Sequence, residues 1–332
     1  MRSTRLSLAL ETGALSLPDE GRIALFRPGG DEDFSTLPAD RIEVIQSFRP
    51  DHDALTRRGL RVSAAPEGEY AAALVCLPRA RAEGRALIAA AAAHLPRGAA
   101  LLVDGQKTDG IDSMLKDLRA RTAVTEPLSK AHGKVFALEN PGPEAFADWH
   151  AAPQQVADGF VTLPGVFSAD GPDKASVLLA GALPAKLPAR VADLGAGWGY
   201  LSRAILSRQG VAELHLIEAE KAALDCARQN ITDPRAQFHW ADATQPWTGA
   251  PFQAIVTNPP FHTSRAADPA LGVAFLTSAA RMLTGSGQLW LVANRNLPYE
   301  RTLATLFREV EEVAGKSAFK VLLATRPTTR AR

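Results

Sequence analysis

A glycine-rich segment constrains the fold of this chain more than any other feature. It reads Asp193-Leu-Gly-Ala-Gly-Trp-Gly199 and lies between a β-rich run at 190–194 and a helical run at 200–207. Closely spaced glycines allow sharp turns and let a ligand approach the backbone. The segment therefore predicts a strand, a tight loop and a helix, which is the repeating unit of a parallel α/β sheet.

The rest of the second half continues this alternation. Runs of strand length alternate with helical runs, as expected for a parallel sheet that is covered on both faces. We expect strands near 190–194, 213–218, 237–240, 252–257 and 288–293, helices near 200–207, 221–230 and 270–283, and a closing pair of strands at 311–314 and 316–324.

The first half shows the same pattern and indicates an internal repeat. Its strand candidates lie at 23–26, 42–47, 60–64, 72–77 and 100–104. The run Ala-Leu-Val-Cys-Leu-Pro at 73–78 parallels Ala-Ile-Val-Thr-Asn-Pro at 254–259. In both halves this run precedes a helix. A second strand, a further helix and a late strand then follow, at 95–105, 113–119 and 135–139 in the first half and at 283–293, 301–308 and 320–324 in the second.

This repeat predicts the domain organisation. A chain of 332 residues is long enough for two domains. We predict an α/β protein with two tandem Rossmann-like domains, 1–145 and 155–332, joined by a linker region within 141–158. Each domain is expected to have a mostly parallel seven-stranded sheet with a closing antiparallel strand.

The two halves are unequal where a ligand is expected. The first half has Leu25-Phe-Arg-Pro-Gly-Gly30 after its first strand, with no acidic residue at the strand end. Pro28 also removes an amide donor from that loop. Where the second half has Asn258-Pro-Pro-Phe261, the first has Leu77-Pro-Arg-Ala80. The first domain is therefore predicted to be a degenerate copy that keeps the fold without the chemistry.

Composition narrows the remaining function classes. The net charge of +1 and the apolar fraction of 46% are ordinary for a globular protein and give no global attraction to nucleic acid. Cys76 and Cys226 have no metal-ligand spacing, so we expect two buried reduced thiols and no metal site. The longest apolar run, 86–93, is too short to span a membrane. These features predict a cytoplasmic protein without a membrane partner.

The glycine segment discriminates between nucleotide cofactors. A dinucleotide-binding loop needs Gly-x-Gly-x-x-Gly or Ala, but Tyr200 and Ser202 occupy the third positions in the two possible frames. An acidic residue before the glycines would repel a pyrophosphate, whereas it suits a cationic ligand with amine donors. Asp193, Gly195, Gly197 and Gly199 are therefore predicted to bind S-adenosyl-L-methionine.

Two further acidic residues follow later strands of the same predicted sheet. Glu218 ends the second strand, and its carboxylate can accept both hydroxyl protons of a ribose. Asp242 follows the third strand and could accept a hydrogen bond from an adenine amino group. Both lie at the carboxyl ends of strands, where open α/β sheets bind ligands. We therefore predict that both residues bind the same cofactor.

A second motif, Asn258-Pro259-Pro260-Phe261, follows the predicted strand at 252–257. The Asn258 side chain and the Pro259 carbonyl can accept N–H bonds from a planar amine or amide, which frees the nitrogen lone pair for attack. Pro260 stiffens the loop. Phe261 offers a ring for stacking a base, and a base inside a helix would have to be flipped out. The motif therefore predicts methyl transfer to a planar nitrogen, and we also count Asn258 among the predicted cofactor-binding residues.

With both motifs in this order, the chain resembles the bacterial ribosomal RNA guanine-N2 methyltransferases, in particular the small-subunit (16S) enzymes of the two-domain type. The similarity covers about residues 145–325 and includes segments outside the two motifs. These are Phe160-Val-Thr-Leu-Pro-Gly-Val-Phe-Ser168 with Asp170-Gly, Phe261-His262, Val292-Ala-Asn294, Leu297-Pro-Tyr299 and Phe319-Lys-Val321.

The resemblance implies transfer of a methyl group from S-adenosyl-L-methionine to the N2 amine of a guanine in 16S rRNA. Its partner would be ribosomal RNA or the small ribosomal subunit, and the chain would be a monomer. Phe167 and Ser168 would line the methionine end of the cofactor site. The first domain would support folding and RNA binding. His262 would shape the pocket or contact RNA, and Arg265 and Arg295 would either meet phosphate or be solvated surface residues.

The motifs themselves leave other acceptors open. A guanine in 23S rRNA, the adenine N6 of DNA and a glutamine amide of a release factor all present a planar nitrogen. A ribosome-assembly factor that only binds the cofactor is a non-enzymatic alternative, although the intact Asp193 and Asn258 argue against it. The 160–168 segment and the degenerate first half favour a guanine in rRNA.

Overall fold

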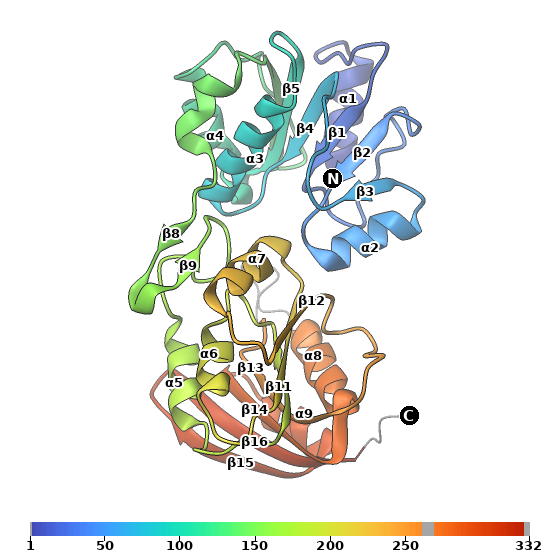
Figure 1. Ribbon diagram of the computed structural model, residues 1–332. Coiled ribbons are helices and arrows are strands. Elements are labelled where there is room, and N and C mark those ends of the chain that lie inside the picture. The colour runs from blue at the N-terminus through green and yellow to red at the C-terminus, as the bar shows by residue number, and fades with distance from the viewer. Residues whose placement is uncertain (1, 261–268, 329–332) are drawn as a thin grey trace. The chain divides into compact units, whose positions relative to one another are not determined.

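The computed structural model of the chain describes residues 2–260 and 269–328 (Figure 1). The chain divides into two compact units, Met1–Pro153 and Gln154–Arg332, which we call the first and second domains. Within the described residues, no helix is both long and apolar enough to cross a membrane. Cys76 and Cys226 are both free and buried, as predicted.

The first domain alternates strands and helices. Its elements are α1 (Arg2–Glu11), β1 (Ile23–Phe26), β2 (Ile42–Ile45), α2 (Arg49–Arg57), β3 (Arg61–Ser63), β4 (Ala72–Cys76), α3 (Arg81–Ala93), β5 (Ala100–Gln106), η1 (Lys107–Asp109), α4 (Ile111–Arg119), β6 (Leu128–Lys130), β7 (Gly133–Glu139) and η2 (Pro143–Trp149).

The second domain begins with a short β-ribbon and then follows a similar order, with the helix α6 added between the first two strands of its large sheet. Its elements are β8 (Gln154–Gln155), η3 (Ala157–Gly159), β9 (Val161–Thr162), α5 (Lys174–Ala182), β10 (Arg190–Leu194), α6 (Tyr200–Leu206), β11 (Glu213–Glu218), α7 (Lys221–Asn230), β12 (Ala236–Trp240), β13 (Phe252–Thr257), α8 (Pro269–Met282), β14 (Leu283–Asn294), α9 (Tyr299–Leu306), β15 (Phe307–Gly315) and β16 (Phe319–Pro327).

The two large sheets have the same topology. Their strand orders are β3-β2-β1-β4-β5-β7-β6 and β12-β11-β10-β13-β14-β16-β15, with seven strands in each. The first five strands of each order are parallel, whereas the last two pair antiparallel. This confirms the predicted pair of tandem Rossmann-like domains, each closed by antiparallel strands.

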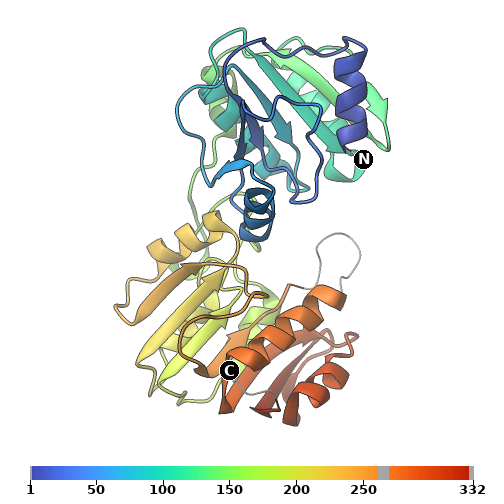
Figure 2. The ribbon, with the colours of Figure 1, turned by 90° about the vertical axis from the view of Figure 1, so that its right-hand side faces the viewer.

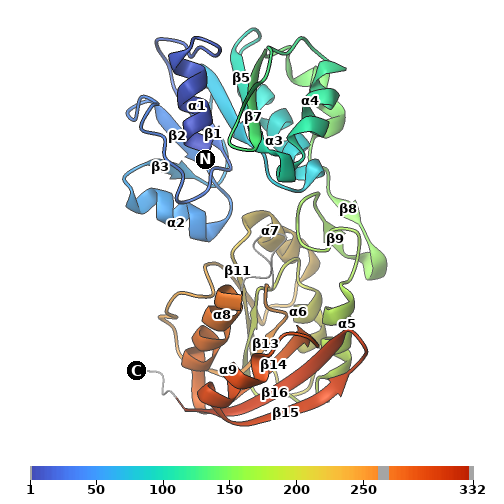
Figure 3. The same ribbon diagram turned by 180° about the vertical axis from the view of Figure 1, so that it is seen from behind.

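Apolar side chains on both faces of each sheet explain the layers. In the first domain, α3 and α4 pack on one face through residues such as Ile88 and Met114, and α1 packs on the other through Leu6 (Figure 2). In the second domain, α5, α6 and α7 cover one face, while α8 and α9 cover the other through Phe275 and Leu303 (Figures 1 and 3). Central strands buried on both faces account for their nearly continuous apolar sequence.

Several elements differ from the predictions, and three of the differences bear on the core and the site. The predicted helix at 301–308 ends at Leu306, because the buried Phe307 already pairs with Pro327 in the sheet. The predicted linker region includes η2, whose Phe146 and Trp149 are buried in the core of the first domain. Helix α5 was not predicted, although Asp173 provides a side-chain cap at its start.

Candidate active site

Both sequence motifs follow neighbouring strands of the second sheet. The glycine segment follows β10 and the Asn258 motif follows β13, and these strands are paired in parallel with Asp193 beside Val256. The Thr257 hydroxyl donates a hydrogen bond of 2.7 Å to the Leu194 carbonyl and ties the two strand ends together. The two motifs therefore meet at the carboxyl edge of the sheet, as the sequence predicts for a ligand site.

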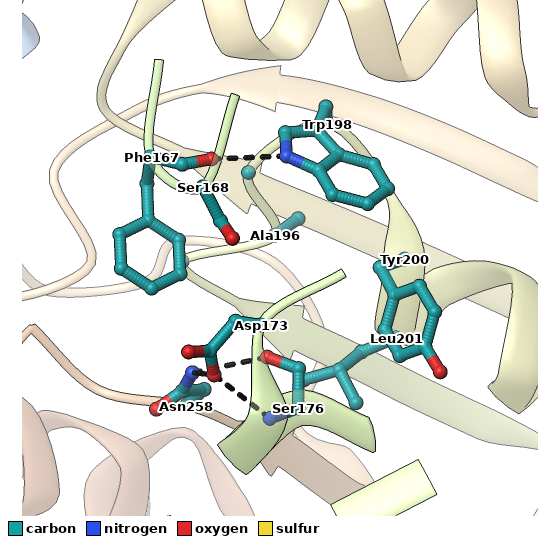
Figure 4. A pocket seen from close by; sticks show the side chains of 11 residues that line it. Phe167, Ser168, Asp173, Ser176, Ala196, Trp198, Tyr200, Leu201 and Asn258 are labelled. Carbon is teal, nitrogen blue, oxygen red and sulfur yellow. Dashed lines mark hydrogen bonds between the residues drawn. The ribbon is translucent and has the colours of Figure 1, made fainter. Parts of the chain in front are cut away.

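A pocket lies at this edge, with about 390 Å³ of empty space when the open solvent at its mouth is included. Figure 4 shows the side chains around it. The bordering residues are Phe167, Ser168, Asp173, Ser176, Gly195, Ala196, Gly197, Trp198, Tyr200, Leu201 and Asn258. The structure thus brings five predicted site residues together: Phe167, Ser168, Gly195, Gly197 and Asn258.

The glycine loop needs its glycines for two different reasons. Gly197 has a φ of +55°, and a Cβ there would meet nothing within 4 Å, so the backbone is open at this point of the pocket. Gly199 has a φ of +94°, and its Cβ would lie 3.1 Å from Ile231. Gly197 therefore leaves room for a ligand, whereas Gly199 allows α6 to begin close to α7.

Asp193 lies beneath the loop and does not border the pocket. Its side chain is fully buried, and Oδ2 accepts a hydrogen bond of 2.6 Å from the Ser202 hydroxyl. Oδ1 is buried and has no hydrogen-bond partner among the described residues. Burial raises the pKa of Asp193 to about 7, and the nearby Glu218 carboxylate contributes to the same direction. An acceptor of this kind is suited to an ammonium or hydroxyl donor of a ligand.

Glu218 ends β11 beside the same loop. Its Oε2 accepts the Gly197 amide at 2.7 Å, and its Oε1 accepts the Glu220 amide at 2.7 Å. Burial is the main cause that raises the pKa of this carboxyl. Each oxygen has a second lone pair, so the carboxylate can hold the loop and still accept hydroxyl protons.

Asp242 is turned toward its own loop. Its Oδ1 accepts hydrogen bonds from the Thr244 amide at 2.8 Å and the Thr244 hydroxyl at 2.7 Å. Gln245 donates to Oδ2 at 3.3 Å. Asp242 is not among the residues that border the pocket. Its predicted contact with adenine stays a prediction.

Asn258 is held from the opposite wall of the pocket. Its Nδ2 donates to Asp173 Oδ2 and to Ser176 Oγ, at 3.0 Å each. Pro259, which follows it, is buried, whereas Pro260 is exposed. Phe261, His262 and Arg265 lie outside the described residues, so the roles predicted for them stay predictions.

Arg295 has partners within its own part of the second domain. Its guanidinium makes an ion pair of 2.8 Å with Glu312 and donates to the Lys316 carbonyl at 3.1 Å. These bonds connect the end of β14 to the hairpin of β15 and β16. The structure therefore gives Arg295 a local structural role, and the predicted contact with phosphate would compete with it.

An aromatic cluster supports the glycine loop from behind. The Phe160 and Trp198 rings lie 4.9 Å apart, and Tyr200 completes the group. Trp198 Nε1 donates to the Phe167 carbonyl at 2.9 Å. Asn230 bonds both backbone groups of Val161 and the Trp198 carbonyl. The segment that carries Phe167 and Ser168 is thereby fastened to the loop.

Sequence reasoning missed several members of this site. Asp173 and Ser176 precede an apolar run with the spacing of a helix N-cap, which could have located α5 but not its contact with Asn258. The aromatic residues beside the loop carried no signal beyond core packing. Among the described residues, no group of three or more His, Cys, Asp or Glu side chains could hold a metal ion.

The sheet order, the glycine loop with its two acids and the adjacent Asn258 define the class of protein as a methyltransferase. A family model described as "Methyltransferase small domain" matches residues 158–323. Ribosomal RNA small subunit methyltransferase C of Pseudomonas aeruginosa is 32% identical over 271 residues, covering 79% of this chain and 81% of the relative. The relative of the same name from Alteromonas mediterranea is 28% identical, covering 86% of each chain.

A solved structure extends the similarity to both domains. A 16S rRNA N2 methyltransferase of T. thermophilus, solved in complex with AdoMet and guanosine, matches with a TM-score of 0.77 and 26% identity. The match covers 98% of this chain and 91% of that one. The chain belongs to the ribosomal RNA small subunit methyltransferase C family. This membership confirms the predicted S-adenosylmethionine-dependent methyltransferase.

Proposed function

We propose that the second domain transfers a methyl group from S-adenosyl-L-methionine to the N2 amine of a guanine in 16S rRNA. One observation carries the proposal: the Asn258 amide is held beside the glycine-loop pocket by two hydrogen bonds, both of which Nδ2 donates. The T. thermophilus relative was solved with AdoMet and guanosine, which supports the same pair of ligands here.

The residues in and beneath the pocket fit the cofactor chemically. Asp193 Oδ1 is a buried acceptor without a donor among the described residues, and Glu218 stands beside it at the end of β11. Two acids at one site favour a cationic ligand. The open backbone at Gly197 gives the ligand room. When bound, S-adenosyl-L-methionine supplies an electrophilic methyl group on a sulfonium.

The residues around Asn258 suit a planar amine. The lone pair of an exocyclic amine is delocalised into its ring, which makes the nitrogen a weak nucleophile. Asn258 Oδ1 and the Pro259 carbonyl can accept its two N–H bonds and localise the lone pair on the nitrogen. Holding the amine in line with the methyl group then supplies much of the rate. Because the methylated amine is acidic, no strong general base is needed.

The first domain is proposed to bind the RNA backbone. A pocket at the carboxyl end of β5 is bordered by Lys107, Lys130, Lys134 and His132, with Asp112 as its one acidic residue among those described. Lys134 pairs with Asp112 at 2.6 Å. Lys107 and Lys130 are exposed, and their charges are suited to phosphate groups.

The remaining proposals concern assembly and location. We propose that the chain acts as a monomer, since the pocket is bordered by residues of the second domain alone. A substrate in the small ribosomal subunit would place the activity in the cytoplasm. Sedimentation analysis with and without RNA tests the monomer, and a dimer at working concentration would contradict it.

The substrate is tested by tritiated methyl transfer. The full chain is offered free small subunits, deproteinised 16S RNA, 23S RNA, DNA and a release factor, and products are identified by nucleoside mass spectrometry. We expect N2-methylguanine in 16S RNA, from the subunit or the naked RNA. Labelling of 23S RNA, DNA or the release factor instead would contradict the proposed substrate, and cofactor binding without transfer to any acceptor would support an assembly factor.

The role of the first domain is tested separately. The double variant K107E/K130E should bind RNA more weakly, and the slope of log affinity against log salt should fall by about 1 for each phosphate that the protein no longer neutralises. Arg57→Glu, an exposed charge on α2, is the control. An unchanged salt slope in the double variant would contradict this mode of RNA binding.

A further inference from the structure

The side-chain amide of Asn258 has two N–H donors and one oxygen acceptor. Asp173 Oδ2 and Ser176 Oγ accept from its Nδ2, at 3.0 Å each. Within the part of the chain that the structure describes, no donor is hydrogen-bonded to its Oδ1. Figure 4 shows the amide nitrogen directed toward α5 and the oxygen directed away from it.

This arrangement selects one of the two orientations of the amide. Turning the amide by 180° would place Oδ1 against the Asp173 carboxylate. The hydrogen bond to Asp173 would then be exchanged for a contact between an oxygen and a negatively charged oxygen, whereas the Ser176 hydroxyl could donate in either orientation. The hydrogen bond to the carboxylate is charge-assisted and stronger than a neutral one. The amide is therefore held with its oxygen available to accept a hydrogen bond from the amine that is to be methylated.

The two partners are themselves held by the start of α5. Asp173 is the N-cap of this helix, and its Oδ2 also accepts the Ser176 amide at 2.9 Å. Ser176 is buried, with 8% of its surface exposed. The helix packs into the core through Leu179. A rigid helix end, 85 residues before Asn258 in the sequence, thus presents both acceptors to one amide.

We infer that Asp173 and Ser176 are positioning residues for methyl transfer, which hold the Asn258 oxygen toward the amine of the target base. This inference rests on the proposed function. Neither residue needs to contact the methylated nitrogen. By accepting hydrogen bonds from Nδ2, they also increase the negative charge on Oδ1 and make it a better acceptor.

The first test removes each acceptor while keeping the helix start. Ser176→Ala leaves the Asp173 cap in place, and Asp173→Ser keeps a residue that caps helices well but is too short to reach Asn258. Each variant should lower kcat about tenfold, the effect of removing one hydrogen bond. KM for RNA and the calorimetric Kd for S-adenosyl-L-methionine should change less than twofold. Ser207→Ala, which removes the exposed hydroxyl of the α6 C-cap residue and its bond to the Ala204 carbonyl, is the control.

The second test is a double-mutant cycle measured in single turnovers with excess enzyme. If Ser176 acts through Asn258, Ser176→Ala should cause no further loss in the Asn258→Ala background. A tenfold loss in both backgrounds would mean that Ser176 only supports the structure, and it would overturn the inference. Full activity of Ser176→Ala and Asp173→Ser would overturn it as well. Full activity of Asn258→Ala would instead contradict the proposed function, so the two failures are distinguishable.

Discussion

The two sheets share one topology but differ at three positions where the second domain is proposed to bind its ligand. Phe26 pairs with Val75 as Asp193 pairs with Val256, so Phe26 stands in the place of the acid. Leu77, two residues after Val75, corresponds in the same way to Asn258, two residues after Val256.

The third position follows from the pairing with the next strand. Phe26 lies beside Ile45 as Asp193 lies beside Leu216, so Ser47 stands in the place of Glu218. Asp193, Asn258 and Glu218 thus each have an apolar or uncharged counterpart in the first domain. The fold tolerates polar residues at these positions in one domain and apolar or uncharged residues in the other, because the positions lie at the ends of strands.

The loop after β1 is filled by its own side chains. Arg27 adopts a φ of +60°, donates to the Ser47 hydroxyl at 2.7 Å and pairs with Glu83 at 3.2 Å. Leu77 is buried, with 4% of its surface exposed. The predicted degenerate site is therefore closed by internal contacts, whereas the second domain keeps Asp193 Oδ1 without a partner among the described residues.

Buried charge is treated differently in the two domains. In the first, Asp104 is fully buried, and both of its oxygens accept from Arg5, while Arg2 adds a third bond. In the second, the buried Asp193 has only Ser202 as a hydrogen-bond donor among the described side chains. The same fold can thus use a buried acid to stabilise itself or leave one oxygen of the acid without a hydrogen-bond donor among the described residues.

The largest effect is expected from breaking the buried ion pair between Arg5 and Asp104 in the first domain. Arg5→Ala should lower the free energy of unfolding by about 3–5 kcal/mol, because it leaves Asp104 buried with too few partners. Urea unfolding measures the loss. The double variant R5M/D104L should lose less than R5A, since it removes both charges. A loss below about 1 kcal/mol in R5A would contradict this prediction, because it would mean that the bonds from Arg5 to Asp104 add little stability.

The second prediction exchanges residues between the corresponding positions 77 and 258. Asn258→Leu should lower kcat about 100- to 1000-fold, as expected when a positioned polar group is removed from a transition state. Binding of S-adenosyl-L-methionine, measured by calorimetry, should survive. Leu77→Asn should instead lower the melting temperature and leave kcat per folded molecule unchanged. If both variants affected kcat alike, the division of roles between the domains would be wrong.

The third prediction concerns pH. The folded chain keeps the Asp193 proton up to about pH 7, whereas the unfolded chain releases it near the usual pKa of 3.8. The folded state therefore binds more protons between these values, and the free energy of unfolding should fall as the pH rises through this window. The contribution is at most about 1.4 kcal/mol per pH unit.

Asp193→Asn isolates this contribution. Urea unfolding of the wild type and the variant at several pH values between about 4 and 8, the window in which the two states differ in bound protons, gives the two slopes. The variant should lack the part of the downward slope due to Asp193. The corresponding Phe26 has no proton to lose, so Phe26→Leu should leave the slope unchanged. Equal slopes in wild type and D193N would refute the raised pKa.

The smallest expected effect is at the closed loop of the first domain. Arg27→Gly relieves the backbone strain of a residue with a left-handed φ, but it removes the hydrogen bond to Ser47 and the ion pair with Glu83. These opposing effects are each about 1 kcal/mol, so stability should change by less than that. Calorimetry should show one cofactor per chain in both proteins. If R27G bound a second molecule of cofactor, the filled loop alone would explain why the first domain binds none, and the missing polar residues would not be needed to explain it.

The sequence predicted the fold well and placed both motifs at the carboxyl ends of neighbouring strands, because both depend on local patterns. Alternating apolar runs predicted the central strands, and the unequal repeat predicted a second sheet of the same topology. The predictions failed where packing decides the ends of elements. Phe307 begins a strand since it is buried against the sheet, and Phe146 and Trp149 join a core that no local pattern reveals.

By itself, the sequence determined the class of cofactor site and the acceptor motif, because a glycine segment after an acid and an Asn-Pro-Pro-Phe motif carry their chemistry in adjacent residues. Only the tertiary structure decided the protonation and orientation of these groups. Burial raises the pKa of Asp193 to about 7. Asp173 and Ser176 reach Asn258 from a helix 85 residues earlier in the chain. Such properties depend on solvent exclusion and on contacts between distant segments, which no run of neighbouring residues specifies.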